Sequence, residues 1–206
     1  MEDILDLYHL PYDAQFPLVC LDESCKQLVD ERIAPLAMIP GHPQRVDHEY
    51  IRHGVAQLFL AVEPLTGLRY LSAGEHRTRK DWAHFVRDLL DIHYPDALKI
   101  RLVQDNLNTH CAISFYETFP APEAHRLTNR IEFHYTPKHG SWLNVAEIEF
   151  SALQSQCLIR RISNLPLLQR EIAAWQLHRN TRPNAIQWQF TTSDARTKLK
   201  HLYPQL

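Results

Sequence analysis

The sequence predicts an α/β protein in which a mixed β-sheet is covered by helices. The segment "VAQLFLAVEPLTGLRYLSAG" (55–74) contains two apolar runs joined at "EPLTG", which is typical of a β-hairpin. Helical and strand patterns then alternate toward the C-terminus, which indicates crossover connections and parallel strand pairs. Hydrophobic residues make up 45% of the chain, enough for a substantial core.

The N-terminal half supplies three strands and one helix of this prediction. "FPLVCLDE" (16–23) is a short apolar run that ends in acid, as a buried strand would. The Pro- and His-rich segment 33–54 predicts an irregular excursion before the hairpin. A helix is expected over 79–94, where Pro95 stops it and apolar residues recur at helical spacing: Trp82, Phe85, Val86, Leu89, Leu90 and His93.

The C-terminal half continues the alternation. We expect strands at 99–106 and 131–137, separated by a short helix at 110–119 and by a surface excursion, "PAPEAHRLTNR". A helix at 141–158 is predicted to be capped by Ser141 or an adjacent residue. A final amphipathic helix covers 166–180, with proline near its start, and the basic tail is expected to be partly helical.

Composition excludes several classes of protein. The formal charge is −2 and the pI about 6.7, which does not suit an autonomous DNA-reading module. No glycine-rich phosphate loop is present, so no nucleotide cofactor is expected. The four cysteines form no CxxC pair and are interpreted as free thiols in a reducing compartment. Because no signal peptide or membrane-length apolar run is visible, we expect a cytoplasmic protein without a membrane partner.

Acidic residues stand where two predicted strands end. Asp22 follows "LVCL" and Asp105 follows "RLVQ", and functional groups gather at strand ends in open α/β sheets. Each acid alone is equally typical of a turn or helix cap. The predicted helix 141–158 offers a third carboxylate, but Glu147 and Glu149 lie roughly 200° apart around a helix axis. At most one of them joins the two aspartates, and spacing alone does not choose which.

Three clustered carboxylates repel one another unless cations neutralise them. Oxygen-rich sites suit hard cations such as Mg²⁺ or Mn²⁺. Two such ions activate a nucleophile on one side and stabilise a leaving oxygen on the other, which is phosphodiester chemistry. The residues therefore favour a metal-dependent nuclease or strand transferase, with a carboxylate-rich binding protein as the alternative.

Three motifs resemble the catalytic domain of DDE-superfamily transposases, with mariner-like bacterial insertion sequences as the nearest branch. They are "LVCLDE", "LVQDNLNTH" and "HYTPKHGSWLNVAEIEF", and the resemblance runs from about Pro11 to the C-terminus. It implies a ribonuclease-H-like fold. It also implies that Asp22, Asp105 and Glu147 are the catalytic residues and the metal ligands. Glu147 is chosen because it stands three residues after Asn144 in the family pattern, which makes Glu149 a bystander.

The resemblance also implies an activity and its partners. The implied reaction is divalent-metal-dependent DNA cleavage at transposon ends, followed by joining of the freed 3′-hydroxyl to target DNA. Mg²⁺ is the implied cofactor, with Mn²⁺ able to substitute and two ions bound when DNA is present. The implied partner is double-stranded DNA, both transposon ends and target, and a homodimer is possible.

Residues beside the acids are candidates for DNA contact. The set taken from the motifs is Asn106, Asn108, His110, Lys138, His139 and Asn144. The residues after Asp105 are expected either to orient that carboxylate or to contact a phosphate; alternatively they only form a turn with Thr109 as a helix cap. Lys138 and His139 either touch DNA or are plain loop residues.

We interpret residues 1–206 as a single catalytic domain. The family's N-terminal helix-turn-helix region is expected to be absent, because the strand that carries Asp22 already begins near residue 16. Two other functions stay open at this point. One is another ribonuclease-H-like DNA nuclease, such as a resolvase. The other is a catalytically inactive remnant that binds DNA or a partner.

Overall fold

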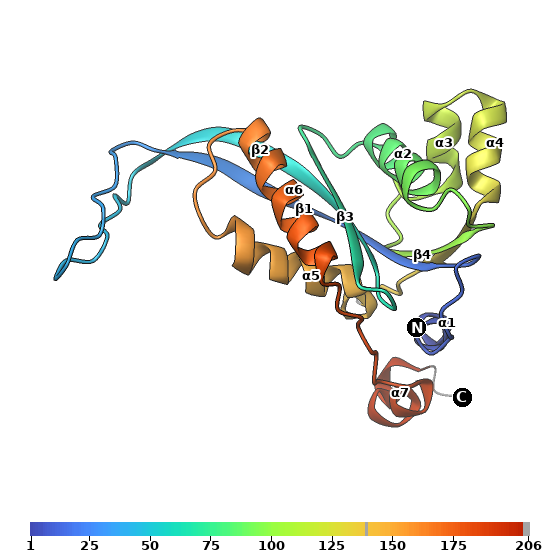
Figure 1. The fold of residues 1–206 in the computed structure, drawn as a ribbon. Coiled ribbons are helices and arrows are strands. Elements are labelled where there is room, and N and C mark those ends of the chain that lie inside the picture. Colours follow the sequence, from blue (N-terminus) through green and yellow to red (C-terminus); the bar gives the residue numbers. More distant parts are fainter. Residues whose placement is uncertain (139, 204–206) are drawn as a thin grey trace.

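A five-stranded mixed sheet forms the centre of the protein (Figure 1). The computed structural model describes residues 1–138 and 140–203. The strand order is β3-β2-β1-β4-β5, with β1 and β2 antiparallel, β2 and β3 antiparallel, and β1–β4 and β4–β5 parallel. The bounds are Leu18–Glu31, Tyr50–Glu63, Leu68–Gly74, Ile100–Gln104 and Ile131–Tyr135. This is the mixed sheet that the sequence predicts, and its architecture is ribonuclease-H-like.

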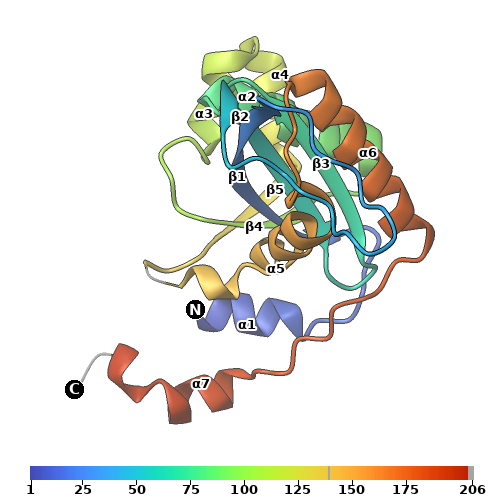
Figure 2. The same ribbon diagram turned by 90° about the vertical axis from the view of Figure 1, so that its left-hand side faces the viewer.

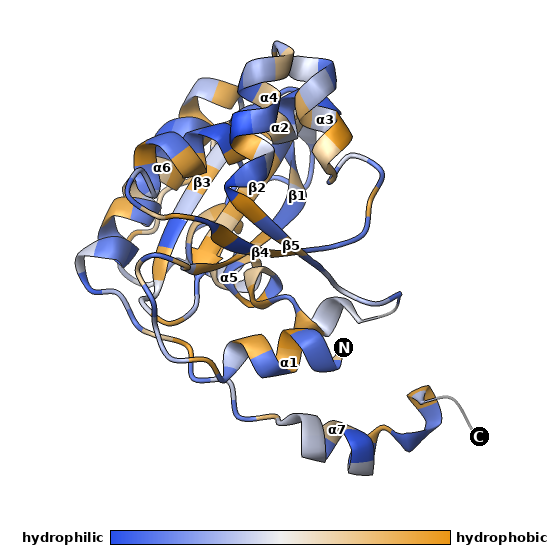
Figure 3. Ribbon diagram, turned by 90° about the vertical axis from the view of Figure 1, so that its right-hand side faces the viewer, coloured by the Kyte–Doolittle hydropathy of each residue, from blue (hydrophilic) through white to orange (hydrophobic). Residues whose placement is uncertain are grey.

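Helices cover both faces of the sheet. The helices α2 (Arg79–Asp88), α3 (Ala112–Thr118) and α4 (Ala121–Asn129) pack on one face, over a core that includes Val19, Leu21 and Trp82. The helices α1 (Glu2–Tyr8), α5 (Val145–Leu153), α6 (Leu165–Thr181) and α7 (Thr192–Lys198) lie on the other face. In Figure 3, α1 and α6 carry both orange and blue segments. The apolar residues of α6 are spread around the helix, so the amphipathic pattern predicted for 166–180 is weak.

The first strand is longer than predicted. β1 continues to Glu31 instead of ending near Glu23, because eleven of its residues pair with β2 in an antiparallel ladder. Asp22 therefore lies inside a strand, opposite Leu60, and not at the end of one. Residues 32–49 project away from the body of the protein at the far end of this ladder (Figure 1). They form the irregular excursion that was expected, although β2 already begins at Tyr50.

Three helices differ from the sequence prediction. The segment "PAPEAHRLTNR", expected as a surface excursion, forms α4, which buries Ala124 and Leu127. The acidic N-terminus, for which no helix was expected, forms α1 and buries Ile4 and Leu5 in the core. In the third, α5, the cap is Asn144 and not Ser141, which begins a short 3₁₀ turn.

Side-chain amides of α6 cover the open edge of the sheet. β3 is an edge strand, and its outward backbone groups would otherwise be free to pair with another chain. Gln169 donates to the carbonyl of Ala73 at 2.8 Å, and Gln176 accepts from the amide of Leu71 at 2.7 Å. Figure 2 shows α6 running beside β3, so these contacts fix the helix along the edge.

Among the described residues, no helix is both long enough and apolar enough to cross a membrane.

Candidate active site

Asp22 and Asp105 lie level with each other on neighbouring strands. The parallel register pairs Leu18 with Arg101 and Cys20 with Val103. Continued by two residues, it brings Asp22 beside Asp105, the residue that follows β4. Cys20 and Val103 belong to the core beneath α5, and alternation along β1 directs Asp22 to the same face.

Helix α5 brings a third carboxylate to this place. Asn144 is 2% exposed, and both polar atoms of its side-chain amide form hydrogen bonds. Its Nδ2 donates to the carbonyl of Leu21 at 2.8 Å, and its Oδ1 accepts from the amide of Ala146 at 3.1 Å. The first contact ties the helix to the residue before Asp22, and the second caps the helix. Glu147, in the first turn of α5, is exposed.

The other two carboxylates contribute to the raised pKa of Asp22. Burial, with a smaller contribution from the negative charges of Asp105 and Glu147, raises the pKa of Asp22 to about 6, against the hydrogen bond from the amide of Glu23. That hydrogen bond is 2.8 Å long. Crowded negative charge of this kind is relieved by a bound cation. An all-oxygen donor set suits Mg²⁺ or Mn²⁺. Within the described part of the chain, no three acidic, His or Cys side chains already converge closely enough to enclose a metal ion.

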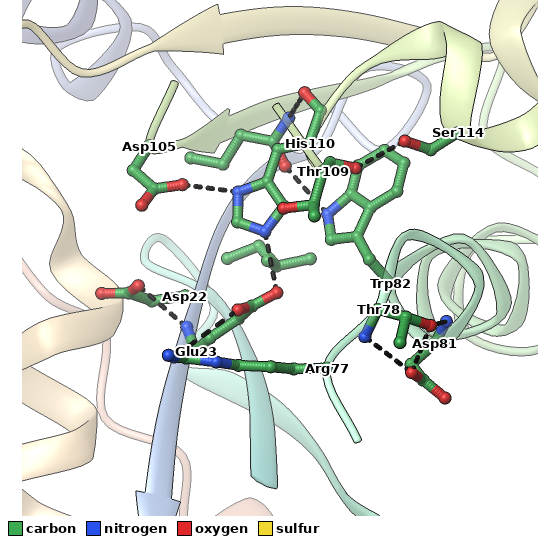
Figure 4. A network of polar contacts seen from close by, with 12 residues as sticks. Asp22, Glu23, Arg77, Thr78, Asp81, Trp82, Asp105, Thr109, His110 and Ser114 are labelled. Atoms are coloured by element: carbon green, nitrogen blue, oxygen red, sulfur yellow. Dashed lines mark hydrogen bonds and ion pairs between the residues drawn. The ribbon is translucent and has the colours of Figure 1, made fainter. Parts of the chain in front are cut away.

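His110 connects Asp105 to another acid that the sequence analysis did not single out. Its Nδ1 lies 2.5 Å from Asp105 Oδ1, and its Nε2 lies 2.8 Å from Glu23 Oε1 (Figure 4). Burial alone would lower the pKa of this fully buried imidazole, but the two carboxylates raise it to about 9. In its protonated form the ring donates to both acids. The sequence offered one indication that Glu23 belongs to the site: it is an acid next to Asp22, at a strand position that faces the core.

Glu149 lies on a different side of α5, as the helical spacing predicts. It is 3% exposed and forms a two-pronged ion pair with Arg69, through Nε and through Nη2, the latter at 3.1 Å from Oε1. Arg179 adds a third contact at 3.4 Å. Both oxygens of Glu149 are therefore occupied inside the protein, and Glu147 is left as the α5 carboxylate beside the aspartates.

The six candidate DNA-contacting residues divide into three groups. Asn106, Asn108 and Lys138 are exposed, so they are free to meet a ligand. His110 and Asn144 are buried, with exposed fractions of 0% and 2%. Direct contact of these two with DNA does not fit this burial. The alternative given for His110, that it orients Asp105, agrees with its hydrogen bond to that carboxylate, and Asn144 instead holds α5. The expectation for His139 lies outside the described residues.

The mixed sheet with three neighbouring carboxylates places this protein in the class of ribonuclease-H-like proteins. Sequence similarity gives the family. Residues 17–169 match the family model described as "DDE superfamily endonuclease". The match covers more than half of the chain, so the chain belongs to the DDE superfamily of endonucleases. Membership in this superfamily implies the use of a divalent metal.

Solved structures share the fold at low sequence identity. The structure titled "Crystal structure of the Mos1 mariner paired end complex with Mn" has a TM-score of 0.56 at 16% identity, over 86% of this chain and 52% of that one. The "Mos1 Strand Transfer Complex" has a TM-score of 0.55 at 14% identity, over 85% and 51%. The Mos1 paired end complex with Mg has 15% identity over 87% and 53%. The chain thus spans about half the length of these transposase chains. No curated protein matches in sequence.

Proposed function

We propose that this chain is the catalytic domain of a mariner-like transposase, which cleaves double-stranded DNA at transposon ends and joins the freed 3′-hydroxyl to target DNA. Asp22, Asp105 and Glu147 are the catalytic residues and hold the divalent cation, Mg²⁺ or Mn²⁺, with two ions present when DNA is bound. The observation that carries this proposal is geometric: the parallel register of β1 and β4 brings Asp22 beside Asp105, and the contact of Asn144 with the carbonyl of Leu21 brings the first turn of α5, with Glu147, to the same place.

The three carboxylates supply the oxygen donors that such an ion prefers. Asp22 is anchored by a rigid strand, and Glu147 by a helix that is capped and tied to that strand. The side chains do not yet surround a common point. This suits Mg²⁺, which is bound through few protein carboxylates and completes its coordination with waters and substrate phosphates.

The bound cations would activate the attacking water or 3′-hydroxyl and stabilise the leaving oxygen. The protein's own contribution is to hold three carboxylates at fixed points, with Asp105 oriented by its hydrogen bond to His110. No nucleophilic side chain is required, so no covalent protein–DNA intermediate is expected.

The DNA contacts are proposed for the exposed members of the candidate set. Asn106 and Asn108 lie on the loop after Asp105, and Lys138 follows β5, the neighbouring parallel strand. All three therefore lie near the carboxyl ends of adjacent strands, on the side of Asp105. Lys138→Ala should weaken DNA binding and reduce its salt slope by about one.

Because a transposase acts on DNA, a cytoplasmic location is the one we propose.

Cleavage and joining assays test the proposal. Purified protein is incubated with plasmid and with pre-cut duplex ends in Mg²⁺, in Mn²⁺ and in EDTA. The parent should nick DNA and join the ends only with a divalent ion, and Asp105→Asn should abolish both reactions. Asp96→Asn is the matched control, because Asp96 is an exposed aspartate before β4 and should leave both reactions intact.

Three results would contradict the proposal in different ways. Equal metal-dependent cleavage by the parent and Asp105→Asn would remove the assigned site. Cleavage without any joining of pre-cut ends would leave a ribonuclease-H-like nuclease and exclude strand transfer by this chain. DNA binding without cleavage in either metal would identify an inactive binding protein.

A further inference from the structure

We propose that Glu23 is a positioning residue, which holds His110 and thereby fixes the carboxylate of Asp105 for a divalent cation. This inference rests on the proposed function, since it concerns the same acidic site. Glu23 belongs to neither the three clustered carboxylates nor the candidate DNA contacts, and its role follows from the buried network in Figure 4.

The side chain of Glu23 is buried, and a buried carboxylate needs a cationic or hydrogen-bonding partner. Its side chain is 6% exposed, and it stands one residue after Asp22, so strand alternation turns it to the opposite face of the sheet. Its Oε1 lies 2.8 Å from His110 Nε2. The guanidinium of Arg77 lies 4.0 Å from its Oε2. A buried carboxylate with these partners has a fixed orientation.

Several contacts besides the hydrogen bond to Asp105 hold His110 in place. Its ring stacks on Trp82, with centroids 5.7 Å apart, and its backbone carbonyl accepts from Gln104 at 2.9 Å and from Tyr135 at 3.0 Å. Backbone contacts fix where the residue is, but rotation of the imidazole is controlled by the two ring nitrogens. Glu23 holds one of them, which directs the other to Asp105.

Asp105 depends on this contact. It follows the last residue of β4 and opens a loop whose next three residues are exposed: Asn106, Leu107 and Asn108. Its Oδ1 is 2.5 Å from His110 Nδ1, and in the described part of the chain no hydrogen bond reaches its Oδ2. The imidazole therefore fixes the carboxylate through one oxygen and leaves the other for a cation. Residues that orient metal-binding side chains in this way typically contribute 10–100-fold to metal affinity or activity.

Binding of Mn²⁺ alone tests the inference, with the free ion counted by electron paramagnetic resonance. The parent is compared with Glu23→Ala and Glu23→Gln, and thermal unfolding without metal is recorded for each. Glutamine keeps an oxygen acceptor for His110 Nε2, and alanine does not. Glu117→Ala is the control, because Glu117 is an exposed acid on α3 paired with Arg79.

Glu23→Ala should weaken Mn²⁺ binding 10–100-fold, whereas Glu23→Gln and Glu117→Ala should stay within about threefold of the parent. If Glu23→Ala proves unfolded, the same comparison is made with His110→Gln, which keeps one amide donor but cannot bridge both acids. Equal affinity in the folded variants and the parent would overturn the inference, as would a parent that binds no Mn²⁺ before DNA is added. Failure of the proposed function is distinguishable, because the parent would then bind Mn²⁺ in this pattern and still cleave no DNA.

Discussion

The side chain of Asn144 joins the carbonyl of Leu21 to the first turn of α5, with a hydrogen bond of 2.8 Å to the strand and one of 3.1 Å to the amide of Ala146. Leu21 precedes Asp22, and Asn144 stands three residues before Glu147. One buried amide therefore sets the spacing between a strand carboxylate and a helix carboxylate. The three-residue spacing between Asn144 and Glu147 has a structural explanation in this contact.

Removal of this amide should cost both stability and activity. Asn144→Ala deletes the cap of α5 and leaves the carbonyl of Leu21 without its donor, which together predict a loss of about 2–4 kcal/mol. The folded fraction should also cleave DNA poorly, because Glu147 is no longer held beside Asp22. Urea unfolding and cleavage per folded molecule measure the two effects.

Asn164→Ala is the matched control. Asn164 caps α6 through the amide of Leu167 at 2.9 Å, and within the described residues its side chain has no hydrogen bond to β1. This variant should lose about 1 kcal/mol and keep its cleavage activity. Equal loss of activity in both variants would show that general destabilisation, and not the tie to Leu21, explains the effect.

The two glutamates of α5 should behave in opposite ways. Glu149→Gln leaves Arg69 as a buried unpaired cation, which is expected to cost about 3–5 kcal/mol. Glu147→Gln changes an exposed side chain and should leave stability almost unchanged while it abolishes cleavage. Chemical unfolding and cleavage assays on both variants separate the roles. The double variant Arg69→Met with Glu149→Met should recover much of the lost stability, and no recovery would contradict the ion-pair explanation.

Glu63 should make the protein less stable as the pH rises. Burial raises the pKa of this carboxyl above its usual 4.5, against hydrogen bonds from Thr66 and Tyr94 that lower it. The folded state then binds more protons than the unfolded state between pH 4.5 and the raised pKa, so the free energy of unfolding falls as pH rises through that window. Glu63→Gln should remove this component of the pH dependence. The free energy of unfolding at a series of pH values tests it, with the exposed Glu117→Gln as the control that should keep the parent's slope.

The amides of α6 should protect the β3 edge from self-association. Gln176 holds the amide of Leu71, and Asn180 accepts from the amide of Arg69 at 3.1 Å and donates to its carbonyl at 2.8 Å. Gln176→Ala combined with Asn180→Ala frees these groups, with a loss of about 1 kcal/mol per hydrogen bond. Light scattering should detect more aggregate than for Gln44→Ala, which changes an exposed residue of the projecting segment 32–49. A monodisperse double variant would argue against edge protection.

Periodicity and turn signals predicted most of the fold. The β2–β3 hairpin is confirmed, with Gly67 in its turn at a φ of +74°, where a side chain would be strained. The end of β1 was predicted wrongly because "SCKQLVDE" is polar, and only its pairing with β2 keeps it extended. Helix α4 was missed because its segment is rich in proline and polar residues. Only two of its residues, Ala124 and Leu127, are buried apolar ones, which is too few to show a helical period.

The candidate site was predictable to a different degree. Helical spacing shows that Glu147 and Glu149 face different ways, but only the buried partner Arg69 shows which one belongs to the core. Burial of His110 and Asn144 depends on contacts with residues far away in the sequence, so no local pattern distinguishes them from exposed DNA contacts such as Asn106. Their tertiary contacts turn both into residues that hold the site together.

Anomalous diffraction from crystals soaked in Mn²⁺ tests the central claim most directly. The account predicts a manganese peak bounded by the carboxylates of Asp22, Asp105 and Glu147 in the parent, and no peak there in crystals of Asp105→Asn. A peak at another place in the parent, or an unchanged peak in Asp105→Asn, would contradict the assignment of this site.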